Sequence, residues 1–109
     1  MNGDIDKLIG FIDENIVFNE EKYPELTGKS EEEKKIFAIR HMALHYAKVT
    51  GKITAVSEAV DHGKELDEEA LKSYVWRMMI NTLYLAKLVD MSEDEILKGI
   101  EEKYGKTVD

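Results

Sequence analysis

Residues 36–60, IFAIRHMALHYAKVTGKITAVSEAV, carry the clearest hydrophobic pattern in this 109-residue chain. Their apolar side chains recur at alternating steps of three and four residues, which is the spacing of one face of an α-helix. The positions are Ile39, Met42, Tyr46, Val49, Ile53, Val56 and Val60. The segment therefore predicts a long amphipathic helix that must bury this face against other elements.

Helix signals continue on both sides of this segment. Ser30 and Glu33 form a capping box, Ser92 stands in the same position before the last helix, and Asp67 is a cap between them. We predict helices over about residues 4–18, 30–62, 67–89 and 92–105, with a loop at 19–29 around Pro24. This is an all-α fold: a small antiparallel four-helix bundle in one domain, 1–109. Residues 1–29 form its N-terminal helix and loop, and residues 30–105 form its core.

The third predicted helix is apolar on nearly all sides, which is typical of a helix that is buried on most of its faces. A chain of this length has too few other helices to cover it. We therefore predict a homo-oligomer, most simply a dimer, that buries the third helix. Its apolar residues are Val75, Trp76, Met78, Met79, Ile80, Leu83, Tyr84, Leu85, Leu88 and Val89.

Composition excludes several classes of function. The net charge of −8 disfavours binding of nucleic acid through bulk charge. The chain has no cysteine, and therefore no disulfide framework or thiolate metal site. The absence of a basic leader and of a long apolar run favours a cytoplasmic protein without a membrane span. Glutamine is also absent while Lys and Glu are abundant, as in proteins from hot environments.

The negative charge is not uniform along the chain. Residues 34–64 contain 6 basic and 2 acidic residues, although the flanking segments are acidic. On the long predicted helix, His41, His45, Lys48 and Lys52 form a polar stripe beside the apolar face. This stripe is expected to be partly buried at its edge. It predicts either charge neutralisation between helices or a basic surface.

A second polar set, Ser73, Arg77 and Asn81, lies within the apolar third helix. A buried arginine needs a partner, because an unpaired charge in a core is costly. One interpretation pairs Arg77 with Glu58, Asp61 or an acid of a second copy. The other makes it part of a cationic pocket for a phosphate or carboxylate, whose oxygens accept hydrogen bonds from Arg and Lys.

Metal chemistry has two weak candidates. His41 and His45 lie one helical turn apart, a spacing that can ligate zinc, but Met42 replaces the glutamate of the metalloprotease motif. His62 lies about 25 Å further along a continuous helix, too far to share a metal. The alternative for a divalent ion is the pair Glu58 and Asp61, three residues apart, with Glu65, Glu68 and Glu69 nearby. We predict no cofactor and no catalytic residue, with Mg²⁺ needed only if the chain is an enzyme that uses these two acids.

Residues 36–103 resemble the MazG-like proteins of the all-α nucleotide pyrophosphohydrolase superfamily. The resemblance rests on ALHYAKVTGKITAVSEAVDHGKELDEEALKSY and NTLYLAKLVDMSEDEILKGIEEKY, and on the order of helices, glycine and acidic caps. It implies a helical dimer, or a dimer of dimers. It also implies hydrolysis of nucleoside triphosphates to monophosphate and pyrophosphate with Mg²⁺ held by four acids on two helices.

The chain departs from that family at its metal site. The four acids that the resemblance implies fall on Val49, Lys52, Tyr74 and Arg77, none of which can hold Mg²⁺. The resemblance therefore implies a MazG-like scaffold that has lost metal-dependent hydrolysis. We predict a binding or regulatory dimer with a phosphate or nucleotide pocket at His45, Lys48, Lys52 and Arg77. The alternatives are a self-associating adaptor without a small-molecule site, and an active pyrophosphohydrolase that uses Glu58 and Asp61.

Overall fold

The computed structural model describes residues 3–109, which form four α-helices and one 3-10 helix and contain no strand. The all-α helical bundle predicted from the sequence is confirmed. No helix in this described part of the chain has the length and apolar character needed to cross a membrane. The elements are α1 (Asp4–Asn15), η1 (Pro24–Leu26), α2 (Glu31–Asp61), α3 (Glu68–Leu88) and α4 (Glu93–Tyr104).

The helix boundaries follow the capping residues. The Ser30 hydroxyl accepts a hydrogen bond from the Glu33 N–H, and the Glu33 carboxylate accepts one from the Ser30 N–H, both at 3.1 Å. Asp67 caps α3 by accepting from the Ala70 N–H at 3.0 Å. These bonds satisfy backbone donors that have no partner within a helix.

The first helix is shorter than predicted, and this is a correction. It ends at Asn15 rather than near Phe18, because the backbone becomes extended at Ile16. Phe18 then packs among aromatic rings instead of continuing the apolar face of α1. Its ring centroid lies 5.2 Å from Tyr23, 5.9 Å from Phe37 and 5.7 Å from Tyr84. This cluster holds the segment between α1 and α2 against the two long helices.

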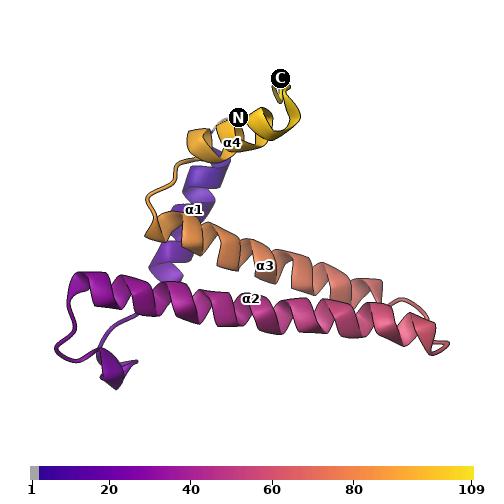
Figure 1. Ribbon diagram of the computed structural model, residues 1–109, viewed down its shortest axis with the longest axis horizontal. Coiled ribbons are helices and arrows are strands. Elements are labelled where there is room, and N and C mark those ends of the chain that lie inside the picture. The colour runs from indigo at the N-terminus through magenta and orange to yellow at the C-terminus, as the bar shows by residue number, and fades with distance from the viewer. Residues whose placement is uncertain (1–2) are drawn as a thin grey trace.

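Helices α2 and α3 form an antiparallel hairpin, and α1 crosses α3 (Figure 1). The hydrophobic core lies at this crossing and not along the whole hairpin. Its buried residues come from α1, α2 and the second half of α3: Ile9, Ile12, Ala38, Met42, Leu83, Tyr84 and Ala86.

The N-termini of α1 and α4 cap each other. The Glu93 carboxylate, which is 4% exposed, accepts hydrogen bonds from the N–H groups of Gly3 and Ile5 at 3.0 and 2.9 Å. In return, the Asp6 carboxylate accepts from the Glu93 N–H at 2.7 Å. Each helix thus supplies a carboxylate to the positive end of the other helix dipole. These three bonds fix α4 beside the start of α1.

Candidate anion-binding site

A surface hollow of about 300 Å³ lies between α2 and α3, and we call it the cationic hollow. It brings together the four residues that the sequence singled out for phosphate binding, with an apolar floor and one amide. Its lining consists of His45, Lys48, Val49, Lys52, Arg77, Ile80 and Asn81.

Helical spacing places these side chains at one edge of the hairpin. His45, Lys48 and Lys52 follow each other at steps of three and four residues, so they project from the same side of α2. Arg77 and Asn81 are four residues apart on α3 and face the same edge. Because α2 and α3 run antiparallel, the two sets meet across the groove between the helices.

The charge in this hollow is uncompensated. No carboxylate lines it, and within residues 3–109 neither lysine nor Arg77 forms an ion pair. Three cations close together repel one another, and this repulsion favours binding of an anion between them. The hollow therefore has the charge and the hydrogen-bond donors for a phosphate or carboxylate group.

The structure corrects the expected burial of these cations. Arg77 is exposed, and its guanidinium lies 5.8 Å from the Tyr74 ring and 5.5 Å from the Trp76 ring. The pairing with Glu58 or Asp61 that would neutralise a buried arginine is not found within the described residues. His45, Lys48 and Lys52 of α2 are exposed too, because no other helix covers this edge of the hairpin.

Asn81 is the one polar side chain that is buried in this lining, with 6% of its surface exposed. Within the described chain its side-chain amide has no hydrogen-bond partner. Every fully enclosed polar side-chain atom among the described residues has a hydrogen-bond partner. Because the Asn81 amide has none, its polar atoms cannot be fully enclosed and must open onto a hollow. An amide in this position can donate to a bound anion.

Replacement of Asn81 by leucine is expected to affect stability and binding in opposite directions. The free energy of unfolding should rise by roughly 0.5–1 kcal/mol, because an unpaired amide is replaced by an apolar group of similar size. Binding of inorganic pyrophosphate should weaken, because one donor is lost. Urea denaturation and calorimetric titration measure the two effects. A clear loss of stability would mean that the Asn81 amide makes a stabilising hydrogen bond.

A histidine pair adjoins the cationic hollow. The Nε2 atoms of His41 and His45 lie 3.1 Å apart, so one ring must donate a hydrogen bond and the other accept it. Burial lowers the pKa of His41, and the positive charges of His45 and Lys22 lower it further, whereas Glu25 acts in the opposite direction. The His41 imidazole therefore stays neutral to lower pH than a free histidine.

This lowered pKa predicts a loss of stability as the pH falls. The unfolded chain binds a proton at His41 near pH 6.5, and the folded chain binds it only at lower pH. The contribution of His41 is complete above pH 6.5 and is lost as the pH falls through the folded pKa. We expect the urea midpoint to fall between pH 7 and 5.5. In His41→Phe, which keeps an aromatic ring in the cluster, this slope should be smaller, and an unchanged slope would contradict the assignment.

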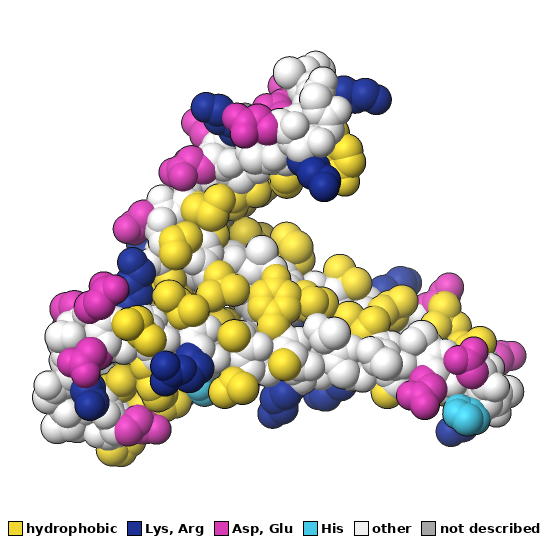
Figure 2. All heavy atoms as spheres, in the orientation of Figure 1, with side chains coloured by type: hydrophobic (Ala, Val, Ile, Leu, Met, Phe, Trp, Pro, Cys, Tyr) yellow, Lys and Arg dark blue, Asp and Glu magenta, His cyan; other side chains and the backbone are white. Residues whose placement is uncertain are grey.

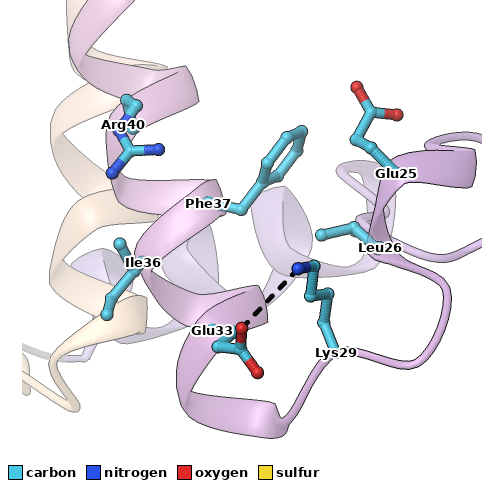
Figure 3. Close-up of a pocket in the computed structure, with 7 residues that line it drawn as sticks. All are labelled: Glu25, Leu26, Lys29, Glu33, Ile36, Phe37 and Arg40. Atoms are coloured by element: carbon cyan, nitrogen blue, oxygen red, sulfur yellow. Dashed lines mark ion pairs between the residues drawn. The ribbon is translucent and has the colours of Figure 1, made fainter.

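A second hollow, of about 320 Å³, lies between η1 and the start of α2 (Figure 3). It also contains two basic residues, Lys29 and Arg40, but two acids line it as well. Lys29 forms an ion pair with Glu33 at 3.8 Å, drawn as the dashed line in Figure 3. Its remaining lining residues are Glu25, Leu26, Ile36 and Phe37. Because its charges balance, it lacks the excess of positive charge that marks the cationic hollow.

The two acids considered for Mg²⁺ are not arranged as a metal-binding site. Glu58 and Asp61 are both exposed in the last turns of α2, where the helix dipole is unfavourable to carboxylates. Among residues 3–109, no group of three or more His, Asp or Glu side chains is placed to hold a metal ion. His41 and His45 are brought together, but without a third ligand from the described residues.

No protein-family model, curated protein or solved structure matches this chain. The fold and the site thus define a small all-helical protein with a cationic hollow between its two longest helices.

Proposed function

We propose that this chain is a non-catalytic protein that binds a phosphate-bearing ligand, such as a nucleotide or pyrophosphate, in the cationic hollow. One observation carries the proposal: His45, Lys48 and Lys52 of α2 and Arg77 of α3 line one hollow that contains no carboxylate. Lysine, arginine and the Asn81 amide supply donors to phosphate oxygens. The floor formed by Val49 and Ile80 can contact an apolar part of the ligand.

The resemblance to MazG-like proteins supports the absence of catalysis. It implies that Lys52 and Arg77 occupy positions of metal-binding acids, and both residues line this hollow. In such an arrangement the cations take over the charge neutralisation that a metal ion provides. They do not supply the polarisation of the phosphoryl group and the activation of water that a metal provides. We therefore propose that this chain has a MazG-like scaffold and binds a phosphate-bearing ligand without hydrolysing it.

Thermal melting with and without ligand tests the binding. A ligand at 100 times its dissociation constant stabilises the folded chain by about 2.7 kcal/mol, which raises the melting temperature by several degrees. We expect this increase with pyrophosphate or ATP in buffer without divalent ions. It should be much smaller in Lys52→Ala and unchanged in Lys87→Ala, a matched substitution on the exposed side of α3. No increase with any phosphate ligand would favour a self-associating adaptor instead.

An assay of pyrophosphate release tests the absence of catalysis. Nucleoside triphosphates with Mg²⁺ or Mn²⁺ should give no release above the blank. Robust turnover that Arg77→Ala abolishes would contradict the proposal. Turnover that requires Glu58 and Asp61 would favour the alternative of an active pyrophosphohydrolase.

A further inference from the structure

The histidine pair of α2 has the geometry of two ligands to one metal ion. The Nε2 atoms of His41 and His45 lie 3.1 Å apart. Two nitrogens that bind one ion at about 2.0–2.1 Å lie about 2.9 Å apart at a right angle and about 3.3 Å apart at a tetrahedral angle. The observed distance falls between these values, so both nitrogens can bind one ion with little movement of either ring.

The fold holds the two rings in these positions. His41 and His45 are four residues apart within the continuous helix α2, so they are neighbours on one side of it. The His41 ring is half-buried, and its centroid lies 5.3 Å from Phe18 and 5.4 Å from Tyr23. His45 is exposed, so its ring can adjust to an ion. One ligand is therefore in place before an ion binds, which lowers the entropy cost of binding.

A hollow of about 250 Å³ adjoins the pair and leaves room for further ligands. Both histidines line it together with Phe18 and Tyr23, and His45 also lines the cationic hollow. Zn²⁺ takes four ligands, and no third His, Asp or Glu among residues 3–109 completes such a set. A water molecule occupies about 30 Å³ in the liquid, so this hollow can hold the waters that fill the remaining positions.

The charges around the pair select the kind of ion. Lys22 lines the hollow beside the pair, and no carboxylate of the described residues lines either hollow that His45 joins. Figure 2 shows basic side chains along the middle of α2 and acidic ones near its two ends. Mg²⁺ and Ca²⁺ need oxygen ligands, mainly carboxylates, which this site does not offer. Zn²⁺ and Cu²⁺ prefer imidazole nitrogen.

We propose that the histidine pair binds one Zn²⁺ or Cu²⁺ ion per chain, with two imidazole nitrogens and water as its ligands. Met42 in place of the metalloprotease glutamate removes a general base and not a ligand, so it does not oppose binding. This site differs from the one that the MazG-like resemblance implies, where four acids on two helices hold Mg²⁺. It also does not rest on the proposed function, because it needs no phosphate ligand.

Nitrogen-15 NMR of the imidazole rings during a titration with ZnCl₂ tests the proposal in buffer without phosphate. We expect saturable shifts of the Nε2 resonances of His41 and His45 at one ion per chain. His62, at the C-terminal end of α2, should not shift. Mg²⁺ should shift none of the three. Absence of zinc binding to the folded wild type, or shifts confined to His62, would overturn the proposal and leave only a hydrogen bond between the two rings.

A relocated histidine is the matched control. The double variant His45→Ala, Ala47→His keeps the number of histidines but places the second imidazole six positions from His41, on another side of the helix. Ala47 is exposed, so the fold should be retained, which circular dichroism checks. Zinc affinity should fall at least about 10-fold, since loss of an outer-shell partner alone costs about 10–100-fold. An unchanged affinity would contradict the site.

His41→Phe separates this site from anion binding, because His41 does not line the cationic hollow. It should abolish the zinc-induced shifts and leave pyrophosphate binding unchanged in buffer without divalent ions. Lys52→Ala should have the opposite effects. Zinc binding without pyrophosphate binding in the wild type would refute the proposed function alone, and pyrophosphate binding without zinc binding would refute the histidine site alone.

Discussion

Replacement of Glu93 by alanine is expected to lower the free energy of unfolding by about 3 kcal/mol, since it removes two hydrogen bonds to a charged acceptor. The N–H groups of Gly3 and Ile5 would lose the carboxylate that caps α1. The same change would detach the start of α4 from α1, because this reciprocal cap is the principal link between the two helices. Urea denaturation at a fixed protein concentration measures the loss.

Glu95→Ala is the matched control for this prediction. Glu95 lies in the same first turn of α4 and has the same relation to the helix dipole, but its side chain is exposed and, among residues 3–109, forms no hydrogen bond or ion pair with another helix. Its replacement should change the free energy of unfolding by no more than about 0.5 kcal/mol. Equal effects of the two substitutions would show that Glu93 acts only through the dipole and not through the bonds to α1.

The double charge reversal Lys52→Glu, Arg77→Glu is expected to weaken pyrophosphate binding at least about 100-fold, which corresponds to about 2.7 kcal/mol. Each substitution removes a donor and places a negative charge beside the bound anion. Both side chains are exposed and form no ion pair within residues 3–109, so the fold should be retained. Calorimetric titration measures the affinity, and circular dichroism checks the helical content.

The control must change the net charge by the same amount. Lys87→Glu with Lys98→Glu does this on α3 and α4, at exposed positions outside the hollow. Long-range attraction should fall equally in the two double variants, and only the loss of local contacts should differ. A similar loss of affinity in both would show that pyrophosphate responds to net charge and does not occupy the cationic hollow.

Local signals in the sequence predicted most of the helical architecture. The capping box at Ser30 and the cap at Asp67 set helix starts within a turn, because the hydrogen bonds that define them join residues three apart. The end of α1 was predicted wrongly, because apolar spacing continues to Phe18 whereas the backbone does not. Contacts between distant residues decide that end, since Phe18 packs against Phe37 and Tyr84.

Contacts between residues that are far apart in the sequence could not be predicted, for the same reason. The mutual caps of Glu93 and Asp6 join residues almost ninety positions apart, and Glu93 looks like any acid in a first helical turn. The residues of the cationic hollow could be predicted from the sequence. Helical periodicity places His45, Lys48 and Lys52 on one side of α2, and Arg77 is a charged residue among apolar neighbours. The exposure of these four side chains could not be predicted from the sequence, because it depends on which sides of α2 and α3 the helix α1 leaves uncovered.

Amide chemical-shift mapping during a titration with inorganic pyrophosphate tests most directly whether the cationic hollow binds phosphate. In buffer without divalent ions, we predict saturable shifts centred on Lys48, Lys52, Arg77 and Asn81, and no shifts in the Lys52→Glu, Arg77→Glu variant. The shifts should weaken as salt rises, because the attraction is electrostatic. An unperturbed spectrum, or shifts centred on Lys29 and Arg40 in the hollow of Figure 3, would show that the cationic hollow does not bind pyrophosphate.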